Sequence, residues 1–355
     1  MAKINIGVVG TGLVGSCFLK QLARVAESYG IALVLVARSS KALVSQKYEP
    51  LNLAQIAAAN GDFEGNSPAL SPVDVAKFLA GSPVPAVLVD NTSNEELAQA
   101  YPEFTTRGVS IVTPNKKAFS STLALWKQLQ APKPPALVYH ESTVGAGLPL
   151  ISSIKDLVAT GDEIKQIEGI LSGTLSYIFN EFSNPSAPVF SDIVKVAKSK
   201  GYTEPDPRED LNGLDVARKV TILARLAGLE VESPTSFEVE SLIPKPLESA
   251  GSADEFLAGL PKFDQDIAAR KDAAAKNGKV LRFVGKIDVP AKKVKVGIEE
   301  YPESHPFASL KGSDNVVSIQ SERYPSPLII QGAGAGDAVT AMGVLADLLK
   351  IAERL

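Results

Sequence analysis

The stretch that decides the fold is Ile4-Asn5-Ile6-Gly7-Val8-Val9-Gly10-Thr11-Gly12-Leu13-Val14-Gly15, close to the start of the chain. Residues 4–9 are mostly apolar and β-branched, which favours a buried strand, and residues 16–29 have helical spacing. A glycine-rich turn between a strand and a helix is typical of dinucleotide binding, because the glycines permit a tight turn, a close approach of the pyrophosphate and close packing. The amide groups that open the helix then face the phosphates. We predict a dinucleotide site at Gly10, Gly12, Leu13, Val14 and Gly15; the alternative is a glycine-rich turn without a ligand.

The rest of the chain divides into two regions of different pattern. In the first 150 residues we expect strands at 3–9, 31–37, 86–90, 109–112 and 136–140 and helices at 13–29, 72–80, 94–106 and 120–130. This alternation predicts an α/β fold, a Rossmann doubly wound domain over 1–150. Over 151–330 we expect an α+β domain, with helices at 149–159, 174–183, 190–200, 211–228, 253–258 and 262–277 and strands at 164–171, 280–288, 294–300, 316–321 and 327–331. Residues 331–355 hold a second glycine-rich turn and a long helix, which we expect to return to the first domain.

The composition excludes several classes of protein. The 355 residues carry a net charge of −4 and no long basic run, so neither nucleic acid nor an anionic membrane is an expected partner. The chain opens on a strand and has no long apolar run, so we expect no signal peptide and a cytoplasmic location. The single cysteine, Cys17, excludes internal disulfides, and we expect it to be buried and unreactive. Two histidines, His140 and His305, are too few for a zinc site built from histidine.

The residues after two strands indicate which dinucleotide binds. An acid at the end of the second strand holds the ribose 2′-OH in NAD sites, whereas here Arg38, Ser39, Ser40 and Lys41 follow that strand. A planar guanidinium and hydroxyls suit a 2′-phosphate, so we predict NADP(H), with NAD(H) also accepted. The alternative is a solvated turn that contains an arginine. Strand 86–90 ends in Asp90-Asn91-Thr92-Ser93, where Thr92 and Ser93 suit the nicotinamide ribose or a phosphate and Asp90 and Asn91 either join them or cap the next helix.

Two further polar clusters also follow expected strands. Thr113-Pro114-Asn115-Lys116-Lys117 places a lysine at the carboxyl end of a strand, and we predict that Lys116 is a site residue. The alternative, two surface lysines that open a helix, is disfavoured by the positive end of the helix dipole. His140 to Pro149 combines Glu141 with a glycine-rich turn, whose carboxylate and carbonyl oxygens suit a hard cation such as Na⁺ or Ca²⁺. The alternative there is a capping glutamate, and we expect His140 to be a packed side chain.

Residues 201–219 hold the densest group of acids. Glu204, Asp206, Glu209 and Asp210 crowd a proline-braced loop, and like charges repel, so a cationic ligand such as an α-ammonium group would explain them. Asp215 and Lys219 follow at helical i, i+4 spacing and share one face. They form either a solvated ion pair of little energetic weight or an acid/base pair in a partly dry site. The acids point to an amino-acid substrate.

These motifs together resemble homoserine dehydrogenase. The resemblance runs from Gly10–Gly15 through Thr113–Lys117, Glu141–Pro149, Ser172-Gly-Thr-Leu-Ser-Tyr177 and Gly201-Tyr-Thr-Glu-Pro-Asp-Pro207 to Asn212-Gly-Leu-Asp-Val-Ala-Arg-Lys219. The sequence is similar to the short fungal form of the family, which lacks the ACT module and the fused kinase of other members. The resemblance implies reversible hydride transfer between NAD(P)H and L-aspartate 4-semialdehyde, which gives L-homoserine in threonine and methionine biosynthesis.

The resemblance also implies roles for individual residues. Lys219 would donate a proton to the forming alkoxide, Asp215 would orient Lys219 and hold the substrate, and Lys116 would be a second acid/base between cofactor and substrate. Glu204 would bind the substrate amino group, with Gly173, Thr174, Tyr202 and Asp210 also in the substrate site. Thr92, Ser93, Gly201 and Gly336 would line the cofactor. Glu141 and the backbone oxygens of Val144, Ala146 and Leu148 would hold Na⁺, and a homodimer would form through the sheet of the second domain.

Three other classes of protein fit the sequence less well. Aspartate-semialdehyde dehydrogenase needs a cysteine nucleophile in its catalytic domain, and Cys17 lies just after the glycine-rich turn instead. A zinc alcohol dehydrogenase would lack metal ligands. A non-catalytic NADP(H)-binding sensor is the remaining alternative, and it is disfavoured because Lys116, Glu204, Asp215 and Lys219 are all present.

Overall fold

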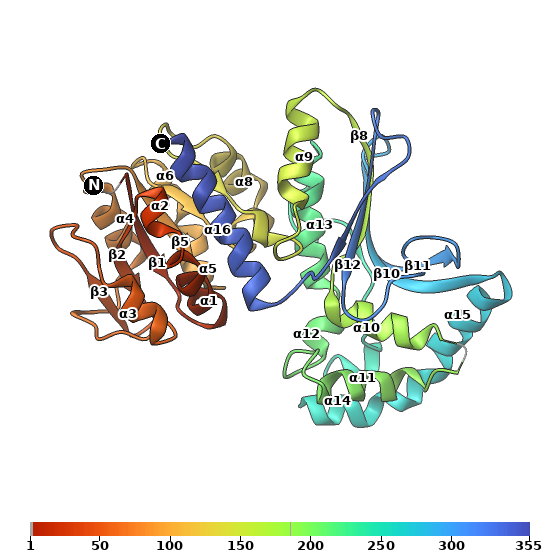
Figure 1. The fold of residues 1–355 in the computed structure, drawn as a ribbon. Helices are drawn as coiled ribbons and strands as arrows, with labels where there is room; N and C mark the ends of the chain where they lie inside the picture. Colours follow the sequence, from red (N-terminus) through yellow and green to blue (C-terminus); the bar gives the residue numbers. More distant parts are fainter. Residues whose placement is uncertain (1–2, 185) are drawn as a thin grey trace. The chain divides into compact units, whose positions relative to one another are not determined.

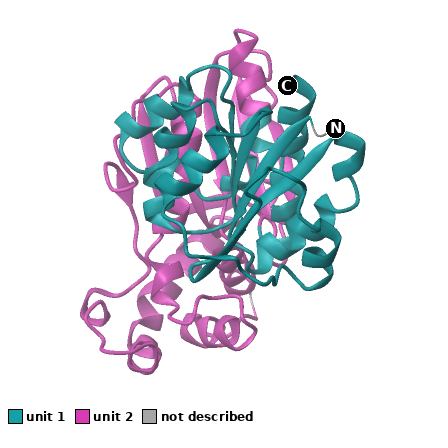
Figure 2. Ribbon diagram, turned by 90° about the vertical axis from the view of Figure 1, so that its left-hand side faces the viewer, with its two compact units in different colours: residues 1–152, 335–355 teal, residues 153–334 magenta. Residues whose placement is uncertain are grey.

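The computed structural model describes residues 3–184 and 186–355. It divides into two compact units (Figures 1 and 2). Unit 1 comprises the chain up to Ser152 together with Ala335–Leu355, and unit 2 is the continuous stretch Ser153–Gly334. The boundaries expected from the sequence, at 150 and 330, fall near these. Within the described residues, no helix has both the length and the apolar character needed to cross a bilayer.

Unit 1 is built on a seven-stranded sheet in the order β4-β3-β2-β1-β5-β6-β7. Its strands are β1 (Ile4–Val9), β2 (Ile31–Ala37), β3 (Lys41–Val44), β4 (Ser67–Pro68), β5 (Ala86–Asp90), β6 (Ser110–Val112) and β7 (Val138–Tyr139). The five strands expected from the sequence are present and run parallel, whereas β3 and β4, which the pattern did not reveal, pair antiparallel beyond β2. The strand order reverses between β1 and β5, so a ligand crevice is expected at their carboxyl ends.

Helices cover this sheet, and two of them are broken where the sequence predicted one piece. The helices are α1 (Leu13–Leu22), α2 (Ala26–Tyr29), α3 (Leu53–Ala58), α4 (Pro72–Ala80), α5 (Glu95–Gln99), α6 (Tyr101–Thr105), α7 (Lys117–Ser120) and α8 (Leu123–Gln130), with a 3₁₀ turn η1 (Glu141–Thr143). The expected helix 94–106 becomes α5 and α6 because Pro102 has no N–H and restarts the ladder. The expected helix 13–29 likewise ends at Leu22 and resumes at Ala26.

The end of the chain completes unit 1. Helix α16 (Asp337–Arg354), blue in Figure 1, shares one apolar core with the first strand and the first helix: Val344 and Leu348 belong to the same buried cluster as Ile6 and Phe18. The Gln21 side chain also donates a hydrogen bond to the Ala338 carbonyl, at 2.8 Å. Unit 1 therefore joins the first strand and helix of the sequence with its last helix.

Unit 2 has a six-stranded sheet in the order β13-β12-β8-β10-β11-β9. Its strands are β8 (Ile164–Ile170), β9 (Glu238–Val239), β10 (Lys279–Asp288), β11 (Lys293–Pro302), β12 (Asn315–Ser321) and β13 (Leu328–Gly332). Its helices are α10 (Gly173–Phe182), α11 (Phe190–Ser199), α12 (Arg208–Leu211), α13 (Leu214–Leu226), η2 (Lys245–Leu247), α14 (Ala253–Gly259), η3 (Leu260–Phe263) and α15 (Asp264–Lys276), and α9 (Leu150–Ala159) precedes them. Antiparallel pairing dominates, and α10 and α13 pack on β10, so the predicted α+β class is confirmed.

Candidate functional site

The glycine-rich turn has the geometry that its three glycines require. Gly10 has φ +91°, a left-handed conformation that favours glycine. A Cβ on Gly15 would lie 2.0 Å from the Gly10 carbonyl oxygen, so the turn itself excludes a side chain there. A Cβ on Gly12 would meet nothing within 4 Å. Gly15, the third glycine, is therefore required by the packing of the turn, whereas Gly12, the second, faces open space at the start of α1.

A cavity of about 840 Å³ opens beside this turn at the carboxyl ends of β1, β2 and β5. It brings together six of the residues predicted to bind the cofactor, namely Gly10, Gly12, Arg38, Ser39, Thr92 and Ser93. Leu13, Val14 and Gly15 follow directly in the first turn of α1. Ala69, Leu70, Ser71, Pro72 and Val75 also line the cavity, from the loop before α4 and its first turn, and they were not predicted because they carry no recognisable motif.

Asp90 holds the polar turns of this crevice in place. Its buried carboxylate accepts hydrogen bonds from the Thr92 amide at 2.8 Å, the Tyr101 hydroxyl at 2.6 Å and the Asn115 side chain at 3.2 Å. Burial raises the pKa of Asp90. The N-cap of α5 is Asn94, so the alternative that Asp90 and Asn91 cap this helix is wrong.

Lys116 lies half-buried on the turn that Asn115 anchors. The Asn115 side chain donates to the Asn94 carbonyl at 2.9 Å, and the carbonyl of Lys116, the N-cap of α7, accepts from the amide of Ser120 at the end of that helix. The neighbouring Lys117 forms the surface ion pair, 3.7 Å from Glu95.

Arg38 is bonded to the glycine-rich turn, not free in solvent. Its Nε donates to the Thr11 hydroxyl at 2.5 Å and its Nη2 to the Thr11 carbonyl at 3.3 Å. Its amide donates to the Lys41 carbonyl, which closes the β2–β3 hairpin and leaves Ser39 exposed at the tip. Asp62, which the sequence analysis missed, lies 3.5 Å from Arg38 and 3.2 Å from Lys41. Arg38 is thus fixed by intramolecular hydrogen bonds, although its side chain is 36% exposed.

In unit 2, Lys219 and Asp215 form a close and partly dry ion pair on α13. Their side-chain nitrogen and oxygen lie 2.8 Å apart, and the Lys219 ammonium also donates to the Leu171 carbonyl at 2.7 Å. The Lys219 side chain is only 12% exposed, whereas that of Asp215 is 40% exposed. The alternative of a fully solvated surface pair does not describe this lysine.

The predicted substrate residues cluster around the start of α10. The Thr174 hydroxyl donates to the Tyr202 carbonyl and, at 3.0 Å, to Asp210, whose other oxygen accepts the Glu204 amide at 2.8 Å. Burial raises the pKa of Asp210, and the nearby charges of Glu204 and Asp215 raise it further. The Thr174 hydroxyl and the Asp210 carboxylate are thus in direct contact, and the charges of Glu204 and Asp215 act on Asp210.

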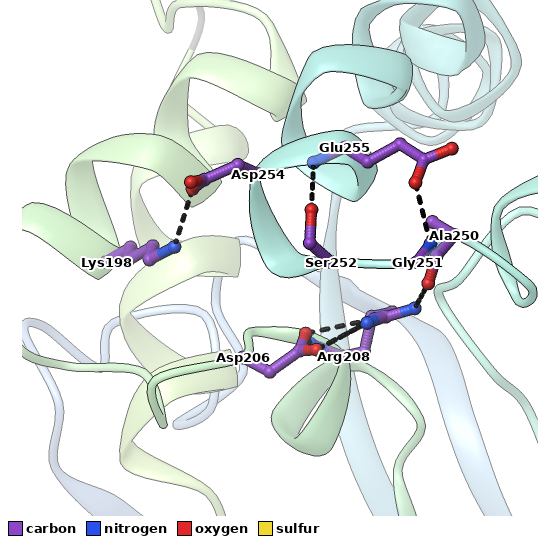
Figure 3. Close-up of polar contacts among 8 residues, drawn as sticks. All are labelled: Lys198, Asp206, Arg208, Ala250, Gly251, Ser252, Asp254 and Glu255. Atoms are coloured by element: carbon purple, nitrogen blue, oxygen red, sulfur yellow. Dashed lines mark hydrogen bonds and ion pairs between the residues drawn. The ribbon is translucent and has the colours of Figure 1, made fainter.

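Part of the acidic loop has a purely structural explanation. Figure 3 shows Asp206 paired with Arg208, at 2.6 Å, while Arg208 also donates to the Ala250 carbonyl at 2.6 Å. Arg208 lowers the pKa of Asp206, so this acid stays ionised on its own account. A cationic ligand is therefore not needed to explain Asp206, whereas the side chains of Glu204 and Glu209 are exposed.

The predicted glycines divide between the units. Gly201, with φ +70°, ends α11 in unit 2, and a Cβ there would meet nothing within 4 Å. Gly336, with φ +116°, is the N-cap of α16 in unit 1. Gly173 opens α10, where a Cβ would lie 3.1 Å from the Ser313 carbonyl. A cavity of about 330 Å³ elsewhere in unit 2, against α15, contains none of the predicted substrate residues.

Glu141 caps a helix in this structure. Its carboxylate accepts the amides of Ile151 at 2.6 Å and Ser152 at 3.0 Å, and the Lys350 ammonium lies 4.0 Å away. Its own amide donates to buried Asp347 at 2.7 Å. The carbonyls of Val144, Ala146 and Leu148 lie in the adjoining turn, where Ala146 has φ +54°. Among the residues described, no group of three or more His, Cys, Asp or Glu side chains could hold a metal, so a cation here would depend on backbone oxygens.

Two other expectations about single residues are settled by burial. Cys17 is half-buried, not buried as expected, because α1 places it beside the start of α16, where its Sγ lies 3.7 Å from an Asp337 oxygen. Burial and the Asp337 charge raise the pKa of the thiol, so it stays protonated. His140 is 1% exposed and stacks on Phe119, which confirms the packed role.

Comparison with known proteins assigns the family. Residues 149–349 match the family model of homoserine dehydrogenase, and residues 10–136 match the model of the homoserine dehydrogenase NAD-binding domain. A homoserine dehydrogenase of Saccharomyces cerevisiae is 57% identical over 360 residues, which cover 99% of both chains.

Solved structures agree with this assignment. A crystal structure of a Candida auris protein of unknown function has a TM-score of 0.94 and 54% identity, and covers 99% of each chain. An archaeal homoserine dehydrogenase in complex with NADPH shares the fold, with a TM-score of 0.73 at 21% identity over 99% of this chain and 98% of that one. The glycine-rich crevice, the Lys219–Asp215 pair and these matches lead to one conclusion: the chain belongs to the homoserine dehydrogenase family of NAD(P)-dependent oxidoreductases.

Proposed function

We propose that this protein reduces L-aspartate 4-semialdehyde to L-homoserine with NAD(P)H, and catalyses the reverse reaction. The observation that carries the proposal is the Lys219–Asp215 pair, a nearly buried ammonium held at 2.8 Å by a carboxylate, next to the acids that suit an amino-acid substrate. The Saccharomyces relative is named for this activity and matches the chain over its full length.

The chemistry follows from what these residues can donate and hold. NAD(P)H, when bound, supplies the hydride. Negative charge develops on the aldehyde oxygen, and we assign Lys219 to neutralise it with a proton, since a lysine is an ammonium at neutral pH. Asp215 and the Leu171 carbonyl fix the direction of that ammonium. Lys116, on its anchored turn, is a second candidate acid/base.

The acids around α10 supply the substrate site in this proposal. Glu204 has an exposed carboxylate and is held by Asp210 through its backbone amide. Its charge suits the α-ammonium group of homoserine. Gly173, Thr174 and Tyr202 complete the site, with Thr174 fixed by hydrogen bonds to Tyr202 and Asp210.

For the cofactor, we propose NADP(H) with NAD(H) also accepted. Arg38 lines the crevice beside Gly12 and Ser39, where a guanidinium and a hydroxyl suit a 2′-phosphate. Thr92 and Ser93 would face the nicotinamide ribose or a phosphate, and Gly201 and Gly336 would approach the cofactor by backbone. The archaeal relative that shares the fold was solved with NADPH.

We further propose a monovalent cation, Na⁺, on Glu141 and the carbonyls of Val144, Ala146 and Leu148. Replacing Na⁺ with choline at equal ionic strength should lower the melting temperature by about 2–4 °C for each kcal/mol of binding energy lost. Calorimetry checks this, and Glu141→Gln should remove the dependence whereas Glu27→Gln, on an exposed helix, should keep it. Equal melting temperatures in both salts would exclude the site.

A homodimer through the sheet of unit 2 is also proposed. Gly285 faces α13, since a Cβ there would lie 2.1 Å from Val220, so Lys286 points to the opposite face. On that face Ser318, Glu168, Lys286 and Lys295 form one half-buried polar row across four strands. A second copy could cover it, and sedimentation velocity that gave only monomer would contradict this.

The test of the proposed function is the absorbance of NAD(P)H formed from homoserine and NADP⁺ or NAD⁺. Turnover with homoserine is expected with both nucleotides. Binding of either nucleotide without turnover would instead favour the non-catalytic sensor.

A further inference from the structure

The end of β2 lacks an acid in the sequence, but the fold brings one there from elsewhere. Asp62 follows α3, and the chain at this point runs against the glycine-rich turn. Gly61 has φ +76°, and a Cβ on it would lie 2.9 Å from the Cβ of Thr11. Because Thr11 also accepts the Arg38 guanidinium, Asp62, Arg38 and the turn form one contact group.

The Asp62 carboxylate forms ion pairs with Arg38 and Lys41, the two cations that could otherwise bind a 2′-phosphate. One of its oxygens lies 3.2 Å from the Lys41 ammonium and 3.5 Å from Arg38. The hydrogen bond from Lys41 lowers the pKa of Asp62, so it is ionised at neutral pH. Its side chain is 63% exposed and can therefore turn away without breaking a packed core. Arg38 lines the crevice of the glycine-rich turn, whereas Lys41 and Asp62 line a second cavity of about 590 Å³, and the Asp62 carboxylate links the two through its contacts with both cations.

We propose that Asp62 selects between the two dinucleotides at the ribose 2′ position. With NAD(H), the Asp62 carboxylate accepts the 2′-OH, as an acid at the end of β2 does in other dinucleotide folds. With NADP(H), the 2′-phosphate replaces Asp62 on Arg38 and Lys41, and the displaced carboxylate repels it. This inference rests on the proposed binding of both cofactors.

The opposite effects on the two cofactors provide the test. Kd for NADH and NADPH is measured by fluorescence titration of the wild type, Asp62→Ala and Asp62→Asn. Loss of a hydrogen bond and of a repelling charge each correspond to about a 3–10-fold change. For Asp62→Ala we expect Kd to rise by this factor for NADH and to fall by it for NADPH. For Asp62→Asn, whose amide oxygen can still accept the 2′-OH, we expect mainly the fall for NADPH.

A matched control separates selection from damage. Glu49→Gln removes an exposed carboxylate that lines neither of these two cavities and should leave both constants unchanged. Parallel shifts of both constants in Asp62→Ala, or no shift in either, would overturn the proposal, and calorimetry of each variant confirms folding. The homoserine assay of the wild type is independent, so opposite shifts in an enzyme inactive on homoserine would sustain the role of Asp62 while refuting the proposed reaction.

Discussion

Replacing Lys219 with methionine is expected to lower kcat for homoserine oxidation by about 10²–10⁴-fold, the usual contribution of a general acid/base. Methionine keeps much of the side-chain volume but can neither donate a proton nor bond to Asp215 and Leu171. Dinucleotide affinity should change less than about twofold, because unit 1 supplies the glycine-rich cavity. Steady-state kinetics together with NADPH fluorescence titration measure the two quantities separately.

The pH profile gives the same assignment a second test. Homoserine oxidation needs the neutral amine of Lys219 as base, and the pKa of an ordinary lysine is about 10.4. We therefore expect kcat in this direction to rise as the pH increases into the alkaline range. Lys165→Met is the control, because Lys165 forms an exposed ion pair with Glu163 in the same unit. A flat profile under conditions where chemistry limits the rate would contradict the role of Lys219.

The second large effect is expected at Gly15. A Cβ there would lie 2.0 Å from the Gly10 carbonyl, and backbone must move to admit it. Gly15→Ala should therefore lower the free energy of unfolding by about 2–3 kcal/mol and the melting temperature by roughly 4–12 °C. Because the turn itself shifts, dinucleotide binding should also be lost. Calorimetry and fluorescence titration measure the two effects.

Gly12→Ala is the matched variant with a different expected outcome. Its Cβ would meet nothing in the folded chain, and the backbone φ of −70° suits alanine. The melting temperature should stay unchanged while Kd for NADPH rises at least about tenfold, because the methyl group intrudes where the pyrophosphate approaches. If Gly12→Ala bound NADPH normally, the cavity would not be the cofactor site.

The fold was predictable where one periodic pattern determined each element. Strand 31–37 is apolar throughout and is buried on both faces, which is typical of an interior strand of a sheet covered by helices. Strands β3 and β4 were missed because they are short, and only the hairpin between Arg38 and Lys41 directs β3 back along β2. A two-residue strand such as β4 has no period to detect.

The site was predictable residue by residue but not in its contacts. The i, i+4 spacing predicted the Lys219–Asp215 pair. It did not predict the hydrogen bond from Lys219 to the Leu171 carbonyl, 48 residues earlier, or the low exposure of the Lys219 side chain. The acidic loop suggested a cationic ligand. In the structure Asp206 is instead paired with Arg208, which also donates a hydrogen bond to the Ala250 carbonyl (Figure 3). Asp62 carried no motif at all and gained its importance only from the path of the chain past Thr11. Such pairings are set by tertiary packing, which a local pattern does not contain.

The docking of α16 has a consequence for how this chain is made. Unit 2 is the continuous stretch Ser153–Gly334, so a ribosome has translated all of it before it reaches Ala335. The core of unit 1 is complete only when α16 has been translated, because Val344 and Leu348 of α16 pack with β1 and α1. During synthesis the second unit is therefore free to mature first. The glycine-rich turn therefore precedes unit 2 in the sequence, whereas α16, which completes the same core, follows unit 2.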